Sequence, residues 1–84
     1  MPGTGSPETR MKYTISVVLE KDGDGWYAHS LDLPGCQSSG ATLDETLANI
    51  REAAELYLQT MSQEDLRALE DRVIVNASVE VNLA

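Results

Sequence analysis

The chain has 84 residues, so we expect one small domain, and its hydrophobic content of 42% is enough for one compact core. The sequence holds 14 Asp and Glu against 6 Lys and Arg, which gives a formal net charge of -8 at pH 7. The basic residues are scattered singly, and this disfavours the basic face that direct nucleic-acid binding normally uses. An acidic balance suits a basic protein partner, although it can also serve solubility alone.

A single cysteine, Cys36, excludes an intramolecular disulfide, and no apolar run approaches the roughly 20 residues that span a bilayer. The first ten residues are rich in Pro, Gly, Ser and Thr and have no apolar stretch of the kind found in a secretory signal. We therefore expect a disordered arm over residues 1–11, a domain over residues 12–84, and a location in the cytoplasm.

The first half of this domain predicts three antiparallel strands. Apolar and polar residues alternate over residues 13–20, which is typical of a strand with one buried face. An acidic, glycine-containing connection over residues 21–25 leads to a second strand over residues 26–31. A Pro34–Gly35 turn then precedes a short, polar strand over residues 36–41, whose composition favours a sheet edge.

The second half predicts two helices and a last strand. Thr42 and Glu45 have the spacing of a capping box, and a helix follows to about Thr60. Its apolar face comprises Leu43, Leu47, Ile50, Ala54, Tyr57, Leu58 and Met61. Ser62 begins a short second helix, and residues 73–83 then alternate cleanly between apolar and polar. We expect this last strand to lie parallel to another strand of the sheet, because helical crossovers join parallel strands.

The predicted order β-β-β-α-(short α)-β defines an α+β fold in which one helical layer covers one face of the sheet. Such a sheet has a partly bare face and an exposed edge, which small proteins often cover by self-association. We therefore expect a homo-oligomer, either a dimer or a tetramer, and the final strand is a candidate for pairing between copies.

Several motifs between Tyr13 and Gln59 together resemble the HicB antitoxin family. The matching motifs are the Tyr-Thr-Ile opening of the first strand, the acidic glycine hairpin, Gly25-Trp26-Tyr27-Ala28, Asp32-Leu33-Pro34-Gly35-Cys36, Gly40-x-Thr42-Leu43-x-Glu45 and Asn49-Ile50-x-Glu52-Ala53-x-Glu55-Leu56-Tyr57-Leu58. The resemblance implies a partial RNase H-like domain. It also implies an antitoxin that neutralises HicA, a small basic mRNA-cleaving toxin, by occlusion. Many members append a DNA-binding domain; this sequence stops at Ala84 after the last predicted strand, so we expect no such domain here.

The sequence holds little that indicates catalysis or metal binding. An RNase H-type nuclease needs several converging carboxylates, but the opening strand carries only Glu20, at its end, and the helix acids Glu45 and Glu52 lie on the solvent face. Cys36 and His29 are too few for a zinc site, and as a catalytic pair they lack a third, orienting group. We therefore expect no catalytic residues, no metal and no cofactor, and a protein that is not an enzyme.

The candidate partner contacts are Asp22, Asp24, Trp26 and Asp32, because an aromatic side chain beside carboxylates is a typical anchor for a basic partner. Three other readings stay open. The chain could be an orphan, self-associating structural or regulatory module, a degenerate RNase H-like nuclease, or a transcription regulator that acts alone.

Overall fold

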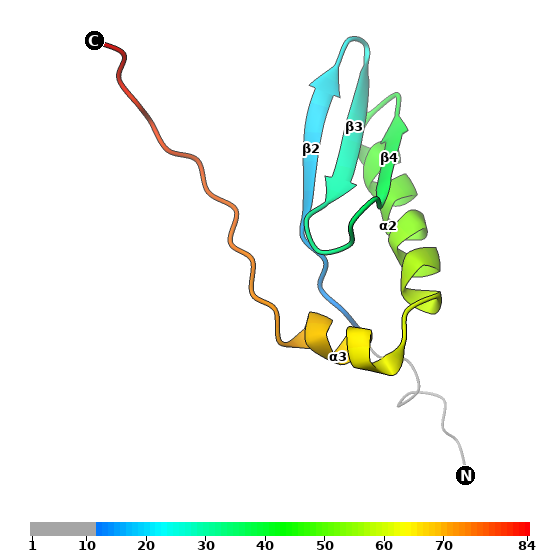
Figure 1. The fold of residues 1–84 in the computed structure, drawn as a ribbon. Coiled ribbons are helices and arrows are strands. Elements are labelled where there is room, and N and C mark those ends of the chain that lie inside the picture. The colour runs from blue at the N-terminus through cyan, green and yellow to red at the C-terminus, as the bar shows by residue number, and fades with distance from the viewer. Residues whose placement is uncertain (1–11) are drawn as a thin grey trace.

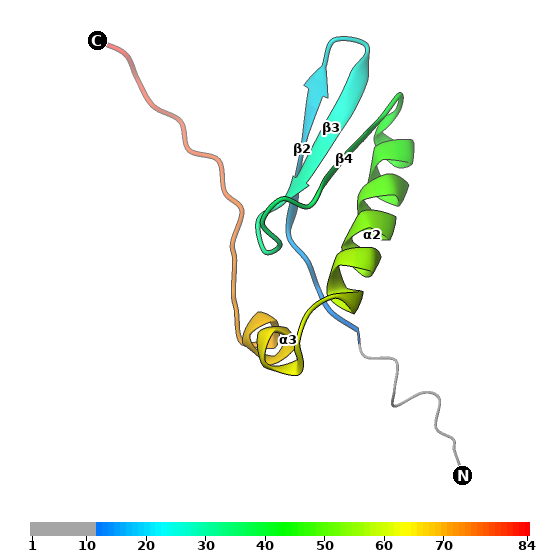
Figure 2. The ribbon, with the colours of Figure 1, turned by 45° about the vertical axis from the view of Figure 1, so that its right-hand side comes forward.

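The structure, a computed structural model, describes residues 12–84; the disordered arm predicted for residues 1–11 lies outside the described residues. The elements in chain order are β2 (Val17–Asp22), β3 (Gly25–Ser30), β4 (Gln37–Gly40), α2 (Leu43–Gln59) and α3 (Gln63–Glu70). Figure 1 shows the three strands side by side with α2 behind them, and the turned view in Figure 2 shows α2 along one face of the sheet. This arrangement confirms the α+β class and the order of the first five predicted elements.

The hairpin of β2 and β3 is antiparallel, with Val17 opposite Ser30 and Asp22 opposite Gly25. Two residues, Gly23 and Asp24, form its turn. Gly23 has φ 62°, a conformation that glycine adopts without strain and that suits the first position of a type II′ hairpin turn. The connection is therefore tighter than the predicted five residues.

The opening strand also begins later than predicted, at Val17 rather than at residue 13. Val17 lies opposite Ser30, the last residue of β3, and beyond this pair the Ser16 carbonyl still accepts the Leu31 N–H at 2.9 Å. The Ser16 backbone N–H donates to the Asp32 carboxylate at 2.6 Å.

β4 pairs antiparallel with β3, from Trp26 opposite Gly40 to His29 opposite Gln37, and it forms one edge of the sheet as predicted. Gly40 lies very close to the start of α2. A Cβ atom on Gly40 would be 2.8 Å from the Thr46 hydroxyl oxygen and 3.0 Å from the Thr46 backbone nitrogen. The absence of a side chain at Gly40 thus lets the first turn of α2 approach the sheet.

The predicted caps are present at both helices. The Thr42 hydroxyl accepts from the Glu45 N–H at 3.1 Å, and Ser62 does the same for Asp65 at 3.1 Å. The Glu45 carboxylate returns to the Ala41 N–H at 2.6 Å, one residue before the position of a standard capping box.

The hydrophobic core lies between the sheet and α2. Among residues 12–84, the buried hydrophobic side chains are Ala28, Leu33, Cys36, Ile50 and Ala54. Tyr57, Leu58 and Met61 pack partly against this cluster, whereas Leu43 and Leu47 are each 41% exposed. The predicted apolar face of α2 is therefore covered in its middle, partly covered toward its C-terminal end and largely uncovered near its start.

The C-terminal segment, residues 73–84, departs from the prediction. It leaves α3 as an extended chain that diverges from the sheet (Figure 1), and no strand is assigned to it. Its large apolar side chains are almost fully exposed: Val73 85%, Val75 82%, Val79 82%, Val81 84% and Leu83 101%. The prediction that it forms a fourth strand of the sheet is wrong for the single chain, because alternation specifies a strand face but supplies no neighbouring backbone.

Candidate functional site

The β2–β3 turn brings three of the four predicted contact residues together. Asp22 ends β2, Asp24 lies in the turn, and both are exposed. Trp26 is half-buried and lies opposite Lys21 on β2 and Gly40 on β4. This acidic hairpin end, defined by Asp22, Asp24 and Trp26, therefore presents two exposed carboxylates and a partly exposed aromatic ring, with Asp22 and Trp26 on opposite faces of the sheet.

Trp26 and Tyr27 lie on opposite faces of the sheet, as their alternation predicts. Trp26 shares its face with the buried Ala28, which is the face that α2 covers. Tyr27 lies on the open face, where its ring is 5.8 Å from that of His29 and its hydroxyl donates to the Gln37 side chain at 2.6 Å. The open face of the sheet therefore carries a small polar and aromatic surface.

Asp32, the fourth predicted contact residue, lies apart from the others in the loop after β3, and it is buried. Its carboxylate accepts the Ser16 N–H at 2.6 Å and pairs with the Arg72 guanidinium at 3.7 Å. Sequence reasoning missed this internal role because Ser16 and Arg72 are remote from Asp32 along the chain. Ser30 is the nearby residue that could have indicated an ordered loop here, because its hydroxyl accepts the Asp32 and Leu33 N–H groups.

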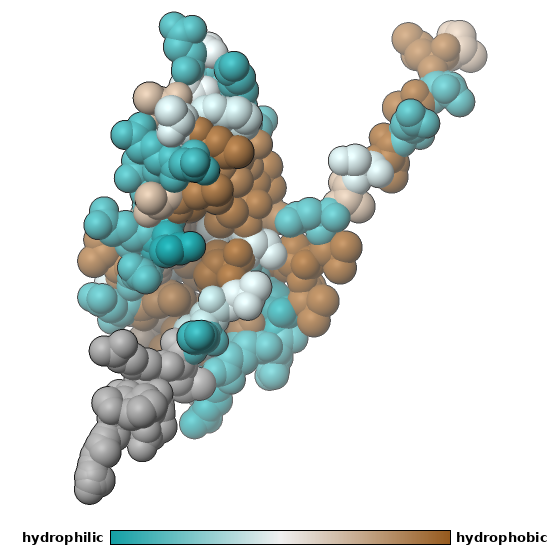
Figure 3. Space-filling view, turned by 180° about the vertical axis from the view of Figure 1, so that it is seen from behind, coloured by the Kyte–Doolittle hydropathy of each residue, from teal (hydrophilic) through white to brown (hydrophobic). Residues whose placement is uncertain are grey.

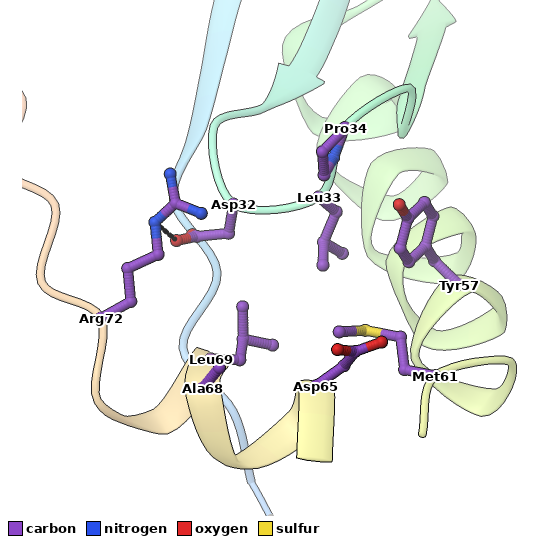
Figure 4. A pocket seen from close by; sticks show the side chains of 9 residues that line it. All are labelled: Asp32, Leu33, Pro34, Tyr57, Met61, Asp65, Ala68, Leu69 and Arg72. Atoms are coloured by element: carbon purple, nitrogen blue, oxygen red, sulfur yellow. Dashed lines mark ion pairs between the residues drawn. The ribbon is translucent and has the colours of Figure 1, made fainter. Parts of the chain in front are cut away.

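A cavity of about 280 Å³ lies beside Asp32, between its loop, the end of α2 and α3. Figure 4 shows the Asp32–Arg72 ion pair on one side of this cavity and Tyr57 and Met61 on the other, with Leu69 and Asp65 on α3. The lining is mostly apolar, and its charged groups are the ion pair and Asp65. The cavity is open to solvent, because Pro34, Asp65, Ala68 and Arg72 in its lining are exposed.

The residues considered for catalysis are dispersed. Glu20 and Glu52 are exposed on different elements, and the Glu45 carboxylate is occupied by the helix cap. Within residues 12–84, no three His, Cys, Asp or Glu side chains lie close enough to hold a metal ion.

Cys36 and His29 do not form a pair. Cys36 is buried in the core, and this burial raises the pKa of its thiol above the ordinary value of 9.0. His29 lies on the open face of the sheet with Tyr27. The thiol is therefore protonated near neutral pH and has no imidazole beside it to act as a base.

The described part of the chain is thus a small α+β protein with an acidic hairpin end and a partly aromatic open sheet face. Neither helix in residues 12–84 is long and apolar enough to cross a membrane. The family model described as the HicB-like antitoxin of bacterial toxin-antitoxin systems matches residues 13–81, and the chain belongs to this family. Membership in it supports an antitoxin role.

Relatives named UPF0150 proteins are similar to the chain. One from Helicobacter pylori (strain J99) is 40% identical over 70 residues, which cover 83% of this chain and 97% of the relative. One from Archaeoglobus fulgidus is 46% identical over 46 residues, which cover 54% of this chain and 67% of the relative. One from Synechocystis is 41% identical over 64 residues, or 75% and 81%. No solved structure matches the chain significantly.

Proposed function

We propose that this protein is the antitoxin of a toxin-antitoxin pair and that it binds and neutralises a small, basic, mRNA-cleaving toxin of the HicA type. The observation that carries the proposal is the family match over residues 13–81. The mechanism is occlusion: the antitoxin covers the toxin's RNA-binding surface and contributes no catalytic group of its own. The protein would act in the cytoplasm, where the toxin meets mRNA.

Charge supports a basic partner. The formal net charge of -8 favours encounter with a basic protein, and the acidic hairpin end concentrates two free carboxylates at one tip of the molecule. Trp26 supplies an apolar anchor at the same end of the molecule. Asp32 would contribute indirectly, because it orders the loop after β3 through Ser16 and Arg72.

We further propose that the sheet and α2 correspond to a partial RNase H-like domain, and that the protein self-associates. In the proposed antitoxin role the domain would not contact DNA or RNA directly, because its basic residues are scattered and form no basic face. The exposed C-terminal segment supports self-association, and it equally favours a second candidate function, a self-associating module of the same fold without a toxin.

The test is inhibition of RNA cleavage by a purified basic toxin encoded next to this protein. We expect cleavage to stop at stoichiometric antitoxin and binding to weaken as salt rises, because charged surfaces are screened. Reversing both acids of the hairpin end, in Asp22→Lys with Asp24→Lys, should weaken binding by about tenfold or more. The matched control is Glu64→Lys with Glu70→Lys, the same charge change on exposed positions of α3.

If both pairs of substitutions weaken binding equally, the hairpin end is not part of the interface, and the weakening is a general effect of net charge. Absence of inhibition at low salt, with the toxin active, would contradict the antitoxin proposal and favour the module without a toxin.

A further inference from the structure

The C-terminal segment, residues 73–84, has the pattern of a strand but has no strand partner in the described chain. Val73, Val75, Ala77, Val79, Val81 and Leu83 form one row. Ile74 and the polar residues Asn76, Ser78, Glu80 and Asn82 form the other. Figure 3 shows this alternation of apolar and polar residues along the projecting chain. A row of valines that is more than four-fifths exposed marks a surface that another surface covers.

The outer edge of β2 is the place in the sheet where such a strand could be added. Among residues 12–84, the sheet order β2-β3-β4 leaves one side of β2 without a neighbouring strand. Below this edge, α2 lies mainly under β3 and β4, and a groove of about 820 Å³ remains between α2 and the start of β2. Its lining is mixed. The apolar part comprises Ile15, Val17, Leu47, Ile50, Ala54 and Leu58, and the rest comprises Tyr13, Thr14 and the charged residues Lys12, Arg51 and Glu55.

The segment is long enough to cover the whole outer edge of β2, and its pattern suits that position. Residues 73–84 would extend over about 40 Å as a strand, whereas β2 (Val17–Asp22) spans about 20 Å. A strand added there turns every second side chain toward α2, so the valine row would enter the groove while Asn76, Ser78 and Asn82 face outward. Within residues 12–84, the segment has no strand beside it and β2 has no strand on its outer side, so this pairing would give each of them a neighbour.

The path of the chain points to a second copy as the donor. α3 and the Arg72–Asp32 ion pair hold the start of the segment beside the loop after β3. From that point the segment runs away from its own β2 in both ribbon views (Figures 1 and 2). Every copy therefore offers both a detached strand and an open edge, which is the condition for reciprocal exchange.

We propose that residues 73–84 of one copy add as a strand to the outer edge of β2 in a second copy, and that reciprocal exchange forms a two-fold symmetric dimer. The exchanged strand covers the apolar part of the partner's groove and closes a sheet edge that would otherwise be open to aggregation. This inference is independent of the toxin, since it concerns contacts between identical chains.

The experiment uses the full chain and two readouts. The first is molar mass by light scattering, for which we expect a dimer. The second is isotope-filtered NMR on dimers that combine one labelled and one unlabelled chain. We expect contacts between methyl groups of Val79 or Val81 in one chain and Ile15, Val17 or Leu58 in the other. These contacts identify the exchange without any variant that endangers folding.

A matched pair of double variants adds a quantitative test. Val79→Asp with Val81→Asp should weaken dimerisation by about 100-fold or more, because two carboxylates would replace valine side chains against the apolar part of the groove, at Ile15, Val17 and Leu58. Ser78→Asp with Asn82→Asp adds the same charge to the outward row and should change dimerisation by less than about tenfold. Amide exchange in the β2–β3 hairpin checks that both variants remain folded.

Three results would overturn the proposal. A monomer whose C-terminal segment is mobile would show that nothing covers the valine row. A monomer with contacts between the segment and its own β2 would show that the strand closes within one chain. A dimer without contacts between the segment and β2 of the other chain would place the interface elsewhere.

Discussion

The guanidinium of Arg72 lies 3.7 Å from the carboxylate of Asp32, and the two side chains differ sharply in exposure, at 51% for Arg72 and 6% for Asp32. The buried partner also accepts the Ser16 N–H at 2.6 Å. Asp32 therefore links the start of β2, the loop after β3 and the end of α3.

Replacing Asp32 tests this link. Asp32→Ala leaves the Ser16 N–H without its acceptor and Arg72 without its partner, so we expect a loss of about 2–3 kcal/mol in the free energy of unfolding. Asp32→Asn keeps an acceptor oxygen and should cost about 1 kcal/mol. Urea unfolding measures both, with the exposed Asp71→Ala as control. A loss for Asp32→Ala no larger than that of the control would show that the buried carboxylate has no structural role.

Gly40 sets the distance between β4 and the first turn of α2. The added methyl group in Gly40→Ala would meet Thr46, which is fully buried and cannot easily move aside. We expect a loss of about 2 kcal/mol in unfolding free energy, in the range found for overpacked sites. Ser39→Ala, at the exposed neighbouring position, should change stability by less than about 0.5 kcal/mol. Equal stability of the two variants would mean that α2 can shift without cost.

The Thr42 hydroxyl caps α2 through the Glu45 N–H. Thr42→Ala removes this acceptor and should lower the free energy of unfolding by about 1 kcal/mol, the usual cost of a lost N-cap. Thr42→Ser restores the hydroxyl and should recover most of that loss. Thermal unfolding followed by circular dichroism distinguishes the cap from the rest of the side chain, because a deficit that serine does not repair would indicate a packing effect of the methyl group.

Burial of Cys36 makes stability depend on pH in the alkaline range. Its pKa is raised in the folded protein, so the unfolded chain loses the thiol proton first as pH rises. Stability from this residue is complete below the ordinary pKa of 9.0 and is lost as pH rises toward the folded value. Urea unfolding between about pH 8 and pH 10 should therefore show a steeper decline for the natural chain than for Cys36→Ala. Parallel declines would show that the thiol titrates alike in both states.

The features that could be predicted from the sequence are those whose cause is local. Gly23 in the hairpin turn, Pro34–Gly35 in the next turn and Thr42 at the helix start each act through backbone conformation or a nearby hydrogen bond. Period-two alternation likewise predicts that Trp26 and Tyr27 lie on opposite faces of the sheet. The order of strands and helices follows from these signals.

The features that could not be predicted depend on distant parts of the chain. Asp32 looks like a surface carboxylate in its own segment, and its burial follows from Ser16 and Arg72. Leu43 and Leu47 fit the apolar face of α2, but residues 12–84 leave each of them 41% exposed. The alternation of residues 73–83 predicts a strand with one apolar face, but it does not indicate which other strand this segment would pair with.

The small core has a consequence for the lifetime of the protein. With five buried hydrophobic side chains in residues 12–84, the isolated chain has a narrow margin of folding free energy. Any partner that binds only the folded form widens that margin according to its concentration. Proteases in a cell should then degrade unbound chains faster than bound ones. The steady-state level of the protein should therefore rise and fall with the level of its partner.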